Sequence, residues 1–318
     1  MNKLFLLFVS HVVIFLLIYF SMIFKPKRFR STSMENAKMS AHVNIVDFSE
    51  TVEENLNCHR TKVLLNYIST HVCIHQKDID IYVSRSFDGN RSIWEEDHVS
   101  FILRLLLQHP ELDFIDIGAN IGTYTMYVAS LGRFVLSVEC FRPNIQRIRR
   151  AVQLAQVENR VLLIENALYN RSGEFLRLNR DARNVGGQYL NLEKAITSSN
   201  NSRIFDPYLV KTIEFNDLLP FLVARGVRAA LMKIDIEGSE VFAIDKGEKI
   251  FDQLDIPLIL MEWLWIRRYS SRVDFLLKFF NQRNYQAKTI GCQPLSLDQH
   301  VHWPSNMIWL KKDRLNFC

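Results

Sequence analysis

From residue 113 onward, short apolar segments alternate with longer segments of helical periodicity, and this alternation limits the folds open to the chain. The expected strands are residues 113–117, 134–139, 160–168, 229–235 and 257–263, with two closing strands near 285–290 and 307–310. Helical patterns fill the intervals at 123–131, 143–157, 239–251 and 271–283. Strands that alternate with helices predict a mostly parallel, doubly wound α/β sheet.

Polar side chains stand where these apolar strands end. In doubly wound sheets, ligands bind outside the carboxyl ends of the strands, at the point where the strand order reverses. We therefore expect the strand-end residues to face a shared site. They are Asp116, Gly118 and Asn120 at the first strand, Glu139 at the second, Asn166 at the third, Asp235 at the fourth and Glu262 at the next.

The first turn favours a ligand without phosphates. A dinucleotide turn has the pattern G-x-G-x-x-G, which lets the backbone approach a pyrophosphate. Here the turn reads Gly118-Ala119-Asn120-Ile121-Gly122, with Asn at the place of the middle glycine. Glu139 follows Gly118 by 21 residues, where an acid accepts hydrogen bonds from ribose hydroxyls. The pattern suits a ligand with a ribose and an amino acid group.

Five motifs, in order, resemble the FkbM-type methyltransferases. They are FIDIGANIGTYT, SVECFRPN, ENALYNRSGEF, KIDIEGSE and LILMEW, within residues 93–311. The resemblance implies a Rossmann-like class I methyltransferase fold with a seven-stranded sheet, mostly parallel with an antiparallel last strand. It also implies S-adenosylmethionine as cofactor and methyl transfer, usually to oxygen and often on a sugar or natural product. Cys140 is a departure, because the family more often has Pro directly after the acid.

The resemblance also implies roles for individual residues. Asp116, Gly118, Asn120 and Gly122 are expected at the methionine end of the cofactor, Glu139 at its ribose, Asn166 beside its adenine and Asp235 near the reacting methyl group. Structural alternatives remain for several positions. Gly122 can simply open a helix, Asn166 can cap a strand end, and Glu240 fits a solvated or helix-dipole residue better than a catalyst.

A hydroxyl acceptor must lose its proton, to a general base or under the influence of a metal. Asp235, Glu237 and Glu262 are the candidate catalytic residues, and oxygen ligands of this kind suit Mg²⁺ or Mn²⁺ better than Zn²⁺. A divalent metal is therefore an open alternative, as is a helix-dipole role for Glu237. His300 and His302 form an HVH pair, for which a loop or surface role is favoured over metal binding.

The segment after Glu262 bears on the acceptor. Trp263, Trp265, Arg267, Arg268 and Tyr269 follow it. Aromatic faces stack on sugar rings, which favours a glycan or small hydroxylated acceptor, with packing against a neighbouring helix as the alternative. Gly186 and Gly187 mark a segment expected to order over the acceptor.

Two other function classes are alternatives. One is a nucleotide-dependent oxidoreductase, which the missing middle glycine argues against. The other is a catalytically silent, membrane-tethered binding protein that retains the fold. Nucleic acid is not an expected partner, because the formal net charge is only +5 and basic residues form no stripe.

The N-terminus predicts a membrane segment. Residues 4–24 carry no formal charge. As a helix, a segment of this length spans a bilayer. An uncleaved signal anchor is favoured over a cleaved signal peptide, because no small-residue cleavage site follows it. We expect an anchor with its basic flank at 1–30, a stem at 31–44, an extension at 45–110 and a methyltransferase domain at 111–318. In the extension, residues 62–69 are an expected helix and residues 79–84 an expected strand.

The orientation of the anchor is argued from both sides. The basic run 25–30 favours a cytosolic domain, whereas sequons at Asn90, Asn170 and Asn200 favour the lumen of the Golgi or endoplasmic reticulum. In the lumen, Cys58 would pair with Cys73 and Cys292 with Cys318, leaving Cys140 free, whereas in the cytosol all five would be thiols. An anchor followed by a stem resembles Golgi glycan-modifying enzymes, which favours a type II protein with a lumenal domain.

Overall fold

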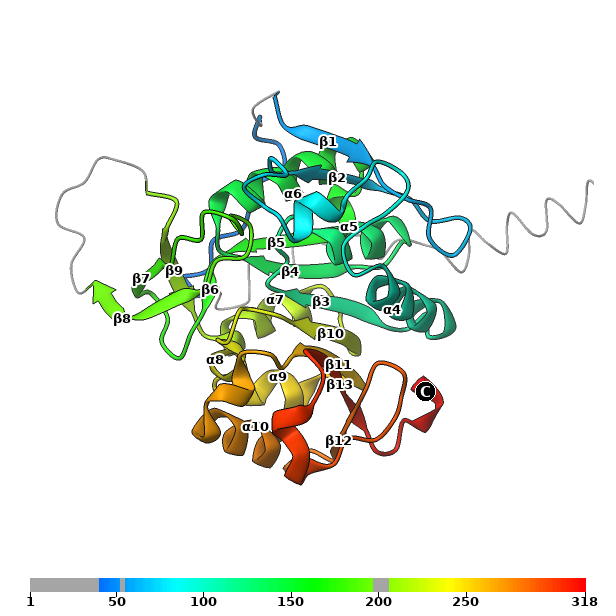
Figure 1. The fold of residues 1–318 in the computed structure, drawn as a ribbon, viewed down its shortest axis with the longest axis vertical. Helices are drawn as coiled ribbons and strands as arrows, with labels where there is room; N and C mark the ends of the chain where they lie inside the picture. Colours follow the sequence, from blue (N-terminus) through cyan, green and yellow to red (C-terminus); the bar gives the residue numbers. More distant parts are fainter. Residues whose placement is uncertain (1–39, 52–54, 197–205) are drawn as a thin grey trace, which may run out of the picture.

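The computed structural model describes residues 40–51, 55–196 and 206–318. Figure 1 shows a central sheet with helices on both faces, in the strand order β12-β13-β11-β10-β3-β4-β5. β13 runs antiparallel to both of its neighbours, and the other pairings are parallel. The strands are β3 (Asp113–Ile117), β4 (Val135–Glu139), β5 (Val161–Glu165), β10 (Ala230–Ile234), β11 (Leu258–Glu262), β12 (Tyr285–Lys288) and β13 (Asn306–Lys311). The expected seven-stranded sheet with an antiparallel last strand is confirmed.

The central strands are apolar because helices cover both of their faces. Every residue of β3, β4 and β10 is buried. Neighbouring positions along a strand point to opposite faces, so Phe114 packs into one hydrophobic core and Ile115 into the other. Strand order reverses between β3 and β10, which places the switch point of the sheet at their carboxyl ends.

The helices divide between these two cores. On one face lie α4 (Glu96–Gln108), α5 (Thr123–Ser130) and α6 (Arg142–Ala155). On the other lie α7 (Leu219–Ala224), α8 (Glu240–Asp245), α9 (Glu248–Gln253) and α10 (Ser270–Gln282). α4 is amphipathic, with Val99, Ile102 and Leu106 buried, and Pro110 lies just beyond its end.

Smaller elements accompany the central sheet. Four strands form a second sheet in the order β6-β9-β7-β8, on the left in Figure 1. They are β6 (Ala167–Leu168), β7 (Phe175–Leu178), β8 (Leu190–Ile196) and β9 (Leu209–Ile213). The extension contributes β1 (Asn57–Arg60), β2 (His71–Ile74) and α3 (Val83–Ser86). Short 3₁₀ helices are η1 (Glu158–Arg160), η2 (Phe215–Leu218), η3 (Ile266–Arg268), η4 (Leu297–His302) and η5 (Leu315–Phe317).

Two predictions for the extension are wrong. Residues 62–69 form a tight turn instead of a helix, because Leu65 and Asn66 have φ of 50° and 68° and Leu64 bridges Ile68. Residues 79–84 form no strand and instead lead into α3. There the Asp80 carboxylate accepts hydrogen bonds from the backbone N–H and the hydroxyl of Ser84, which favours a helical start.

Disulfides join the predicted cysteines. Cys58 pairs with Cys73 across β1 and β2, and Cys292 pairs with Cys318 near the C-terminus. Cys140 is a free thiol, as expected for the remaining cysteine. The predicted signal anchor and most of the predicted stem lie outside the described residues. Within the described ranges, no helix is both long and apolar enough to cross a membrane.

Candidate active site

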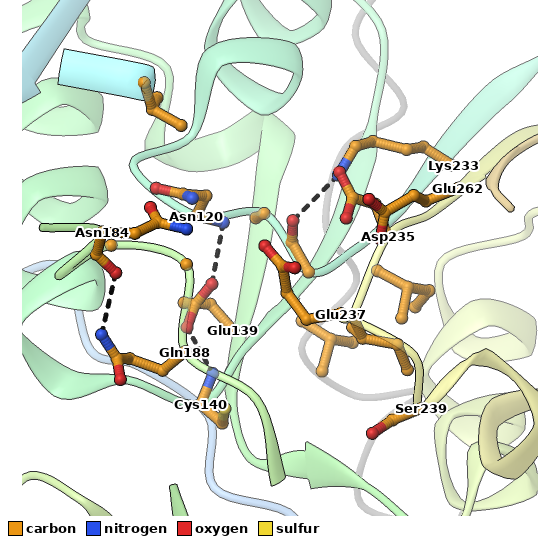
Figure 2. A pocket seen from close by; sticks show the side chains of 18 of the residues that line it. Asn120, Glu139, Cys140, Asn184, Gln188, Lys233, Asp235, Glu237, Ser239 and Glu262 are labelled. Atoms are coloured by element: carbon orange, nitrogen blue, oxygen red, sulfur yellow. Dashed lines mark hydrogen bonds and ion pairs between the residues drawn. The ribbon is translucent and has the colours of Figure 1, made fainter. Parts of the chain in front are cut away.

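A cavity of about 650 Å³ opens at the carboxyl ends of the central strands. Its wall comes from the turn after β3, the ends of β4, β10 and β11, the residues between β5 and β6, the extension, and the segment 181–190. Figure 2 shows Glu139 and Cys140 on one side and Lys233, Asp235 and Glu262 together on the other, with Glu237 between them. A volume of this size suits a cofactor together with part of an acceptor.

The turn after β3 fixes a carboxylate at the cavity wall. The backbone N–H of Asn120 donates to Oε2 of Glu139 at 2.8 Å, and those of Cys140 and Phe141 donate to Oε1 at 2.9 and 2.7 Å. Burial nevertheless raises the pKa of Glu139 to about 7. Each carboxylate oxygen offers two lone pairs, so this fixed group can still accept hydrogen bonds from a ligand.

Gly118 allows β3 and β10 to approach closely at the cavity. Its φ is 78°, and a Cβ atom at this position would lie 1.8 Å from the carbonyl oxygen of Asp235. Gly118 and Asn120 both line the cavity, as expected. The missing side chain therefore lets the backbones of Gly118 and Asp235 lie against each other at the cavity wall.

Asp116 and Gly122 were expected to line the cavity, but both lie behind its wall. Asp116 is fully buried, and its Oδ2 accepts hydrogen bonds from the N–H and the hydroxyl of Thr125 at 3.1 and 2.6 Å. Gly122 precedes α5 with φ of 88°, and a Cβ there would lie 3.0 Å from Ile148. Both residues shape the start of α5, the structural alternative foreseen for Gly122.

Asn166 lines the cavity, but its amide binds the protein itself. Oδ1 accepts the N–H of Asn44 at 2.7 Å, and Nδ2 donates to the carbonyls of His42 and Lys211 at 3.2 and 3.1 Å. The side chain therefore joins the N-terminal segment to β9 at the end of β5.

A buried lysine was missed by the sequence analysis. Nζ of Lys233 donates to the carbonyl of Gly118 at 2.9 Å and lies 3.4 Å from Oδ2 of Asp235. Burial acts to lower the pKa of Lys233, but Asp235, Asp116 and Glu95 outweigh it and hold the pKa above its ordinary value. The available signal was a cation within an apolar strand, since such a charge requires a partner.

The predicted catalytic carboxylates meet on this side of the cavity. Burial, reinforced by the charges of Asp235 and Glu237, raises the pKa of Glu262 to about 11. Burial and Asp235 raise the pKa of Glu237 to about 8, although its Oε2 accepts the indole N–H of Trp265 at 2.8 Å. Burial raises the pKa of Asp235 as well, but Lys233 lies beside this carboxylate and opposes the rise.

Glu95 adds a fourth carboxylate that the sequence analysis did not single out. It lies just before α4 with φ of 50° and lines the cavity. Tyr124 donates its hydroxyl to Oε2 at 2.7 Å, and Asn306 donates its amide to Oε1 at 3.0 Å. Because Asn306 belongs to β13, Glu95 joins the extension to the far end of the sheet.

Glu240 is not the solvated residue that was expected. It is fully buried, and its Oε1 accepts the backbone N–H groups of Ile236 and Gly238 at 3.0 and 3.1 Å. Burial raises its pKa to about 7. Glu240 therefore holds the loop that carries Glu237 into the cavity.

The aromatic residues after Glu262 have different roles. Trp263 is buried against Trp303 and Trp309, so it is part of the core. Trp265 lines the cavity, with the guanidinium of Arg268 stacked 4.3 Å from its ring centre. Tyr82 and Trp94, from the extension, also line the cavity.

The glycine segment lies over the cavity, where it was expected. Its Gly186 carbonyl accepts the Asn144 amide at 2.8 Å. Ile81 donates its N–H to Arg183 at 3.0 Å, and Val185 donates to Ile79 at 3.1 Å. These bonds join the segment to α6 and to the extension. The segment and the extension therefore cover the cavity together.

The His300 and His302 pair belongs to a short 3₁₀ helix, η4. The carbonyl of His300 accepts the indole N–H of Trp263. Across residues 40–51, 55–196 and 206–318, no group of three or more His, Cys, Asp or Glu side chains is arranged to hold a metal ion.

Comparison with known families assigns the fold. The family model described as "Methyltransferase FkbM domain" matches residues 116–287, more than half of the chain. The chain belongs to the FkbM methyltransferase family. This FkbM protein is therefore an S-adenosylmethionine-dependent methyltransferase, and the expected family and enzyme class are confirmed.

The solved structures to which the chain is similar share little sequence with it. A putative caffeoyl-CoA O-methyltransferase from Staphylococcus aureus is 12% identical, with 69% of this chain and 85% of that chain covered and a TM-score of 0.40. An O-methyltransferase from Bacillus cereus in complex with SAH is 14% identical, with 66% and 80% covered and a TM-score of 0.35. No curated protein matched this chain.

The residues of the cavity fit S-adenosylmethionine. Gly118 and Asn120 line the cavity at the turn after β3, and Oε2 of Glu139 accepts only one of the three backbone hydrogen bonds to that carboxylate, which leaves it a lone pair for a ligand. A ribose needs such an acceptor, and an amino acid group needs polar backbone and carboxylates. Both are present on one continuous wall.

Proposed function

We propose that this FkbM methyltransferase methylates a hydroxyl oxygen of a sugar, a glycan or another small hydroxylated acceptor. The observation that carries the proposal is the lining of the cavity, which combines carboxyl groups with aromatic side chains. Asp235, Glu237 and Glu262 supply carboxyl groups there, and Tyr82, Trp94 and Trp265 supply aromatic surface. Hydroxyl-rich rings bind through this combination of hydrogen-bond acceptors and flat apolar faces.

The cofactor supplies an electrophilic methyl group on a sulfonium cation. Gly118, Asn120 and Glu139 would hold it along the wall formed by β3 and β4. What the protein adds is alignment and exclusion of water, which is worth several kcal/mol of the barrier when the geometry is tight. The extension and the segment 181–190 cover this wall and keep water out.

Asp235 is our candidate for the general base. Its carboxylate has the Lys233 amine 3.4 Å away, which favours the ionised form. Glu262, with a pKa of about 11, is protonated at neutral pH and acts as a hydrogen-bond donor toward the acceptor. Glu237, with a pKa of about 8, titrates just above neutrality and can exchange a proton with solvent. The three carboxyl groups therefore divide donor and acceptor roles.

We further propose that residues 1–30 anchor the enzyme in the membrane and that its catalytic domain faces the lumen of the secretory pathway. Two disulfides support an oxidising compartment. Asn90, the first residue of an N-x-S sequon, is exposed in a turn, where glycosylation requires it. The basic residues 25–30 argue for the opposite orientation, so protease protection of the domain in sealed microsomes is the deciding assay.

Incubation of the full-length protein with methyl-labelled S-adenosylmethionine tests the function. The acceptor panel contains free sugars, glycans, lipids and peptides, and mass spectrometry locates the added methyl group. We expect label on a sugar hydroxyl, lost in Asp235→Asn and kept in the matched control Asp274→Asn, an exposed carboxylate on α10. Label on peptides or lipids alone would refute the glycan proposal, and full activity of Asp235→Asn would refute the base.

A further inference from the structure

A single amine connects the cofactor turn to the acidic end of the cavity. Nζ of Lys233 donates to the carbonyl of Gly118 at 2.9 Å and lies 3.4 Å from Oδ2 of Asp235 and 3.9 Å from Oδ1 of Asp116. The side chain is 7% exposed. The amine thus contacts groups from both strands that meet at the switch point of the sheet.

The register of the sheet creates this arrangement. Lys233 of β10 is directly opposite Asp116 of β3. Side chains two positions apart on a strand point to the same face, so Lys233 and Asp235 share one face at the mouth of β10. Gly118 completes the set because its missing side chain leaves the backbone of β3 close to that of β10.

Stability alone is a weak reason for a lysine in this place. A buried ion pair often contributes less than well-packed apolar residues of the same size, because both charges lose their water. A contact with a backbone carbonyl in the cofactor turn, combined with a contact to a carboxylate in the cavity, points to alignment as the function of the amine.

We propose that Lys233 is a positioning residue that holds the cofactor turn and the Asp235 carboxylate in one relative arrangement. Its amine fixes the Gly118 carbonyl where the methyl donor binds, favours the ionised form of Asp235 and orients that carboxylate beside the turn. That a cofactor binds at this turn rests on membership of the methyltransferase family. Only the role of Asp235 as a base rests on the proposed function.

The surroundings of Asp235 make Lys233 decisive for its charge. The titratable groups that face it are Lys233 on β10, Asp116 on β3, Glu95 before α4, Tyr124 on α5, Glu262 on β11, Glu237 in the following loop and Glu240 on α8. Apart from Lys233, every member of this group is an acid. Loss of the amine therefore raises the pKa of Asp235.

Cofactor binding tests this role without any acceptor. Isothermal titration calorimetry on the full-length protein in detergent compares S-adenosylmethionine, which carries a positive sulfonium, with the neutral S-adenosylhomocysteine, from pH 5.5 to 8.5. The variants are Lys233→Met, Asp235→Asn, the double variant, and the exposed control Lys278→Met on α10. Thermal unfolding of each variant confirms that it is folded.

We expect Lys233→Met to weaken binding of both compounds at least about tenfold, because the Gly118 turn loses its hydrogen bond. The double variant is expected to lose less than the product of the two single losses, because the two residues act through each other. Binding of the cationic compound alone is expected to fall at low pH in Lys233→Met, with a midpoint about one unit or more above that of the wild type. Lys278→Met is expected to behave as the wild type.

Unchanged binding in Lys233→Met, or losses that multiply in the double variant, would overturn the proposal. If Lys233→Met does not fold, Lys233→Gln replaces it, since the amide keeps a donor for Gly118 and removes the charge. Wild-type binding by Lys233→Gln across the pH range would overturn the proposal equally. Absence of a sugar acceptor affects none of these outcomes, so failure of the proposed function is recognised separately.

Discussion

Replacement of Gly118 by alanine probes the closest backbone approach at the site. The added Cβ would lie 1.8 Å from the carbonyl oxygen of Asp235, a separation that real Cβ contacts do not show. The ends of β3 and β10 must therefore move apart by roughly 1 Å. Gly118→Ala thus perturbs the strand mouths without removing any charged group.

The structure sets the size of the effect. Alanine at the Gly118 φ of 78° costs about 1 kcal/mol. Separation of the strand ends also weakens the bond from the Asp235 N–H to the Ile117 carbonyl and the bond from Lys233 to Gly118. At about 1 kcal/mol for the neutral bond and about 2 kcal/mol for the charged one, the free energy of unfolding falls by about 4 kcal/mol.

Gly226 provides a matched control, because its φ of 74° is similar and its Cβ would meet nothing within 4 Å. We expect Gly226→Ala to lower the free energy of unfolding by about 1 kcal/mol and to leave cofactor binding unchanged. Denaturant unfolding and calorimetric titration with S-adenosylmethionine measure both quantities. Equal effects of the two substitutions on unfolding, or normal binding by Gly118→Ala, would refute the reasoning.

Three further predictions concern other contacts. Asn144→Ala removes the hydrogen bond to His75 and the bond to the Gly186 carbonyl, which holds the segment 181–190 over the cavity. We therefore expect the free energy of unfolding in denaturant to fall by about 2 kcal/mol and cofactor binding to weaken. Unchanged cofactor binding would contradict this prediction. Loss of the disulfide between Cys58 and Cys73, which closes a 15-residue separation, is expected to cost about 3 kcal/mol. The measurement compares denaturant unfolding of the Cys58→Ala/Cys73→Ala double variant with that of the wild type, and equal stability would contradict the prediction. Glu262 has a pKa of about 11 in the folded protein and ionises near its ordinary value in the unfolded chain, so the free energy of unfolding is expected to fall as pH rises from 5 to 9. Denaturant unfolding at pH 5, 7 and 9 is expected to show a smaller fall for Glu262→Gln than for the wild type. Equal falls in the two proteins would contradict this prediction.

The sequence predicted the sheet well because its strands are buried on both faces. Short runs rich in apolar residues, such as 113–117 and 229–235, alternate with helical segments, so their length and the turn residues beside them predicted strands of a covered parallel sheet. The extension was predicted poorly for a local reason. Residues 62–69 carry apolar residues at helical spacing, but positive φ at Leu65 and Asn66 turns the chain, and the pattern of side chains does not reveal that.

The site was predictable at the level of strand ends and less so at the level of orientation. Gly118, Asn120 and Glu139 line the cavity as expected. Asp116, however, points under α5 to Thr125, because successive side chains of a strand face opposite ways and the sequence alone does not assign the faces. Lys233 escaped notice because its role depends on the pairing of β10 with β3.

Titration of the full-length protein with S-adenosylmethionine, and in parallel with NAD, is the most direct test of the assignment to methyl transfer. We expect S-adenosylmethionine to bind with one site per chain, to lose at least about tenfold in affinity in Glu139→Ala, and NAD not to bind. Binding of NAD at the same site, or an absence of S-adenosylmethionine binding by the folded wild type, would contradict the assignment.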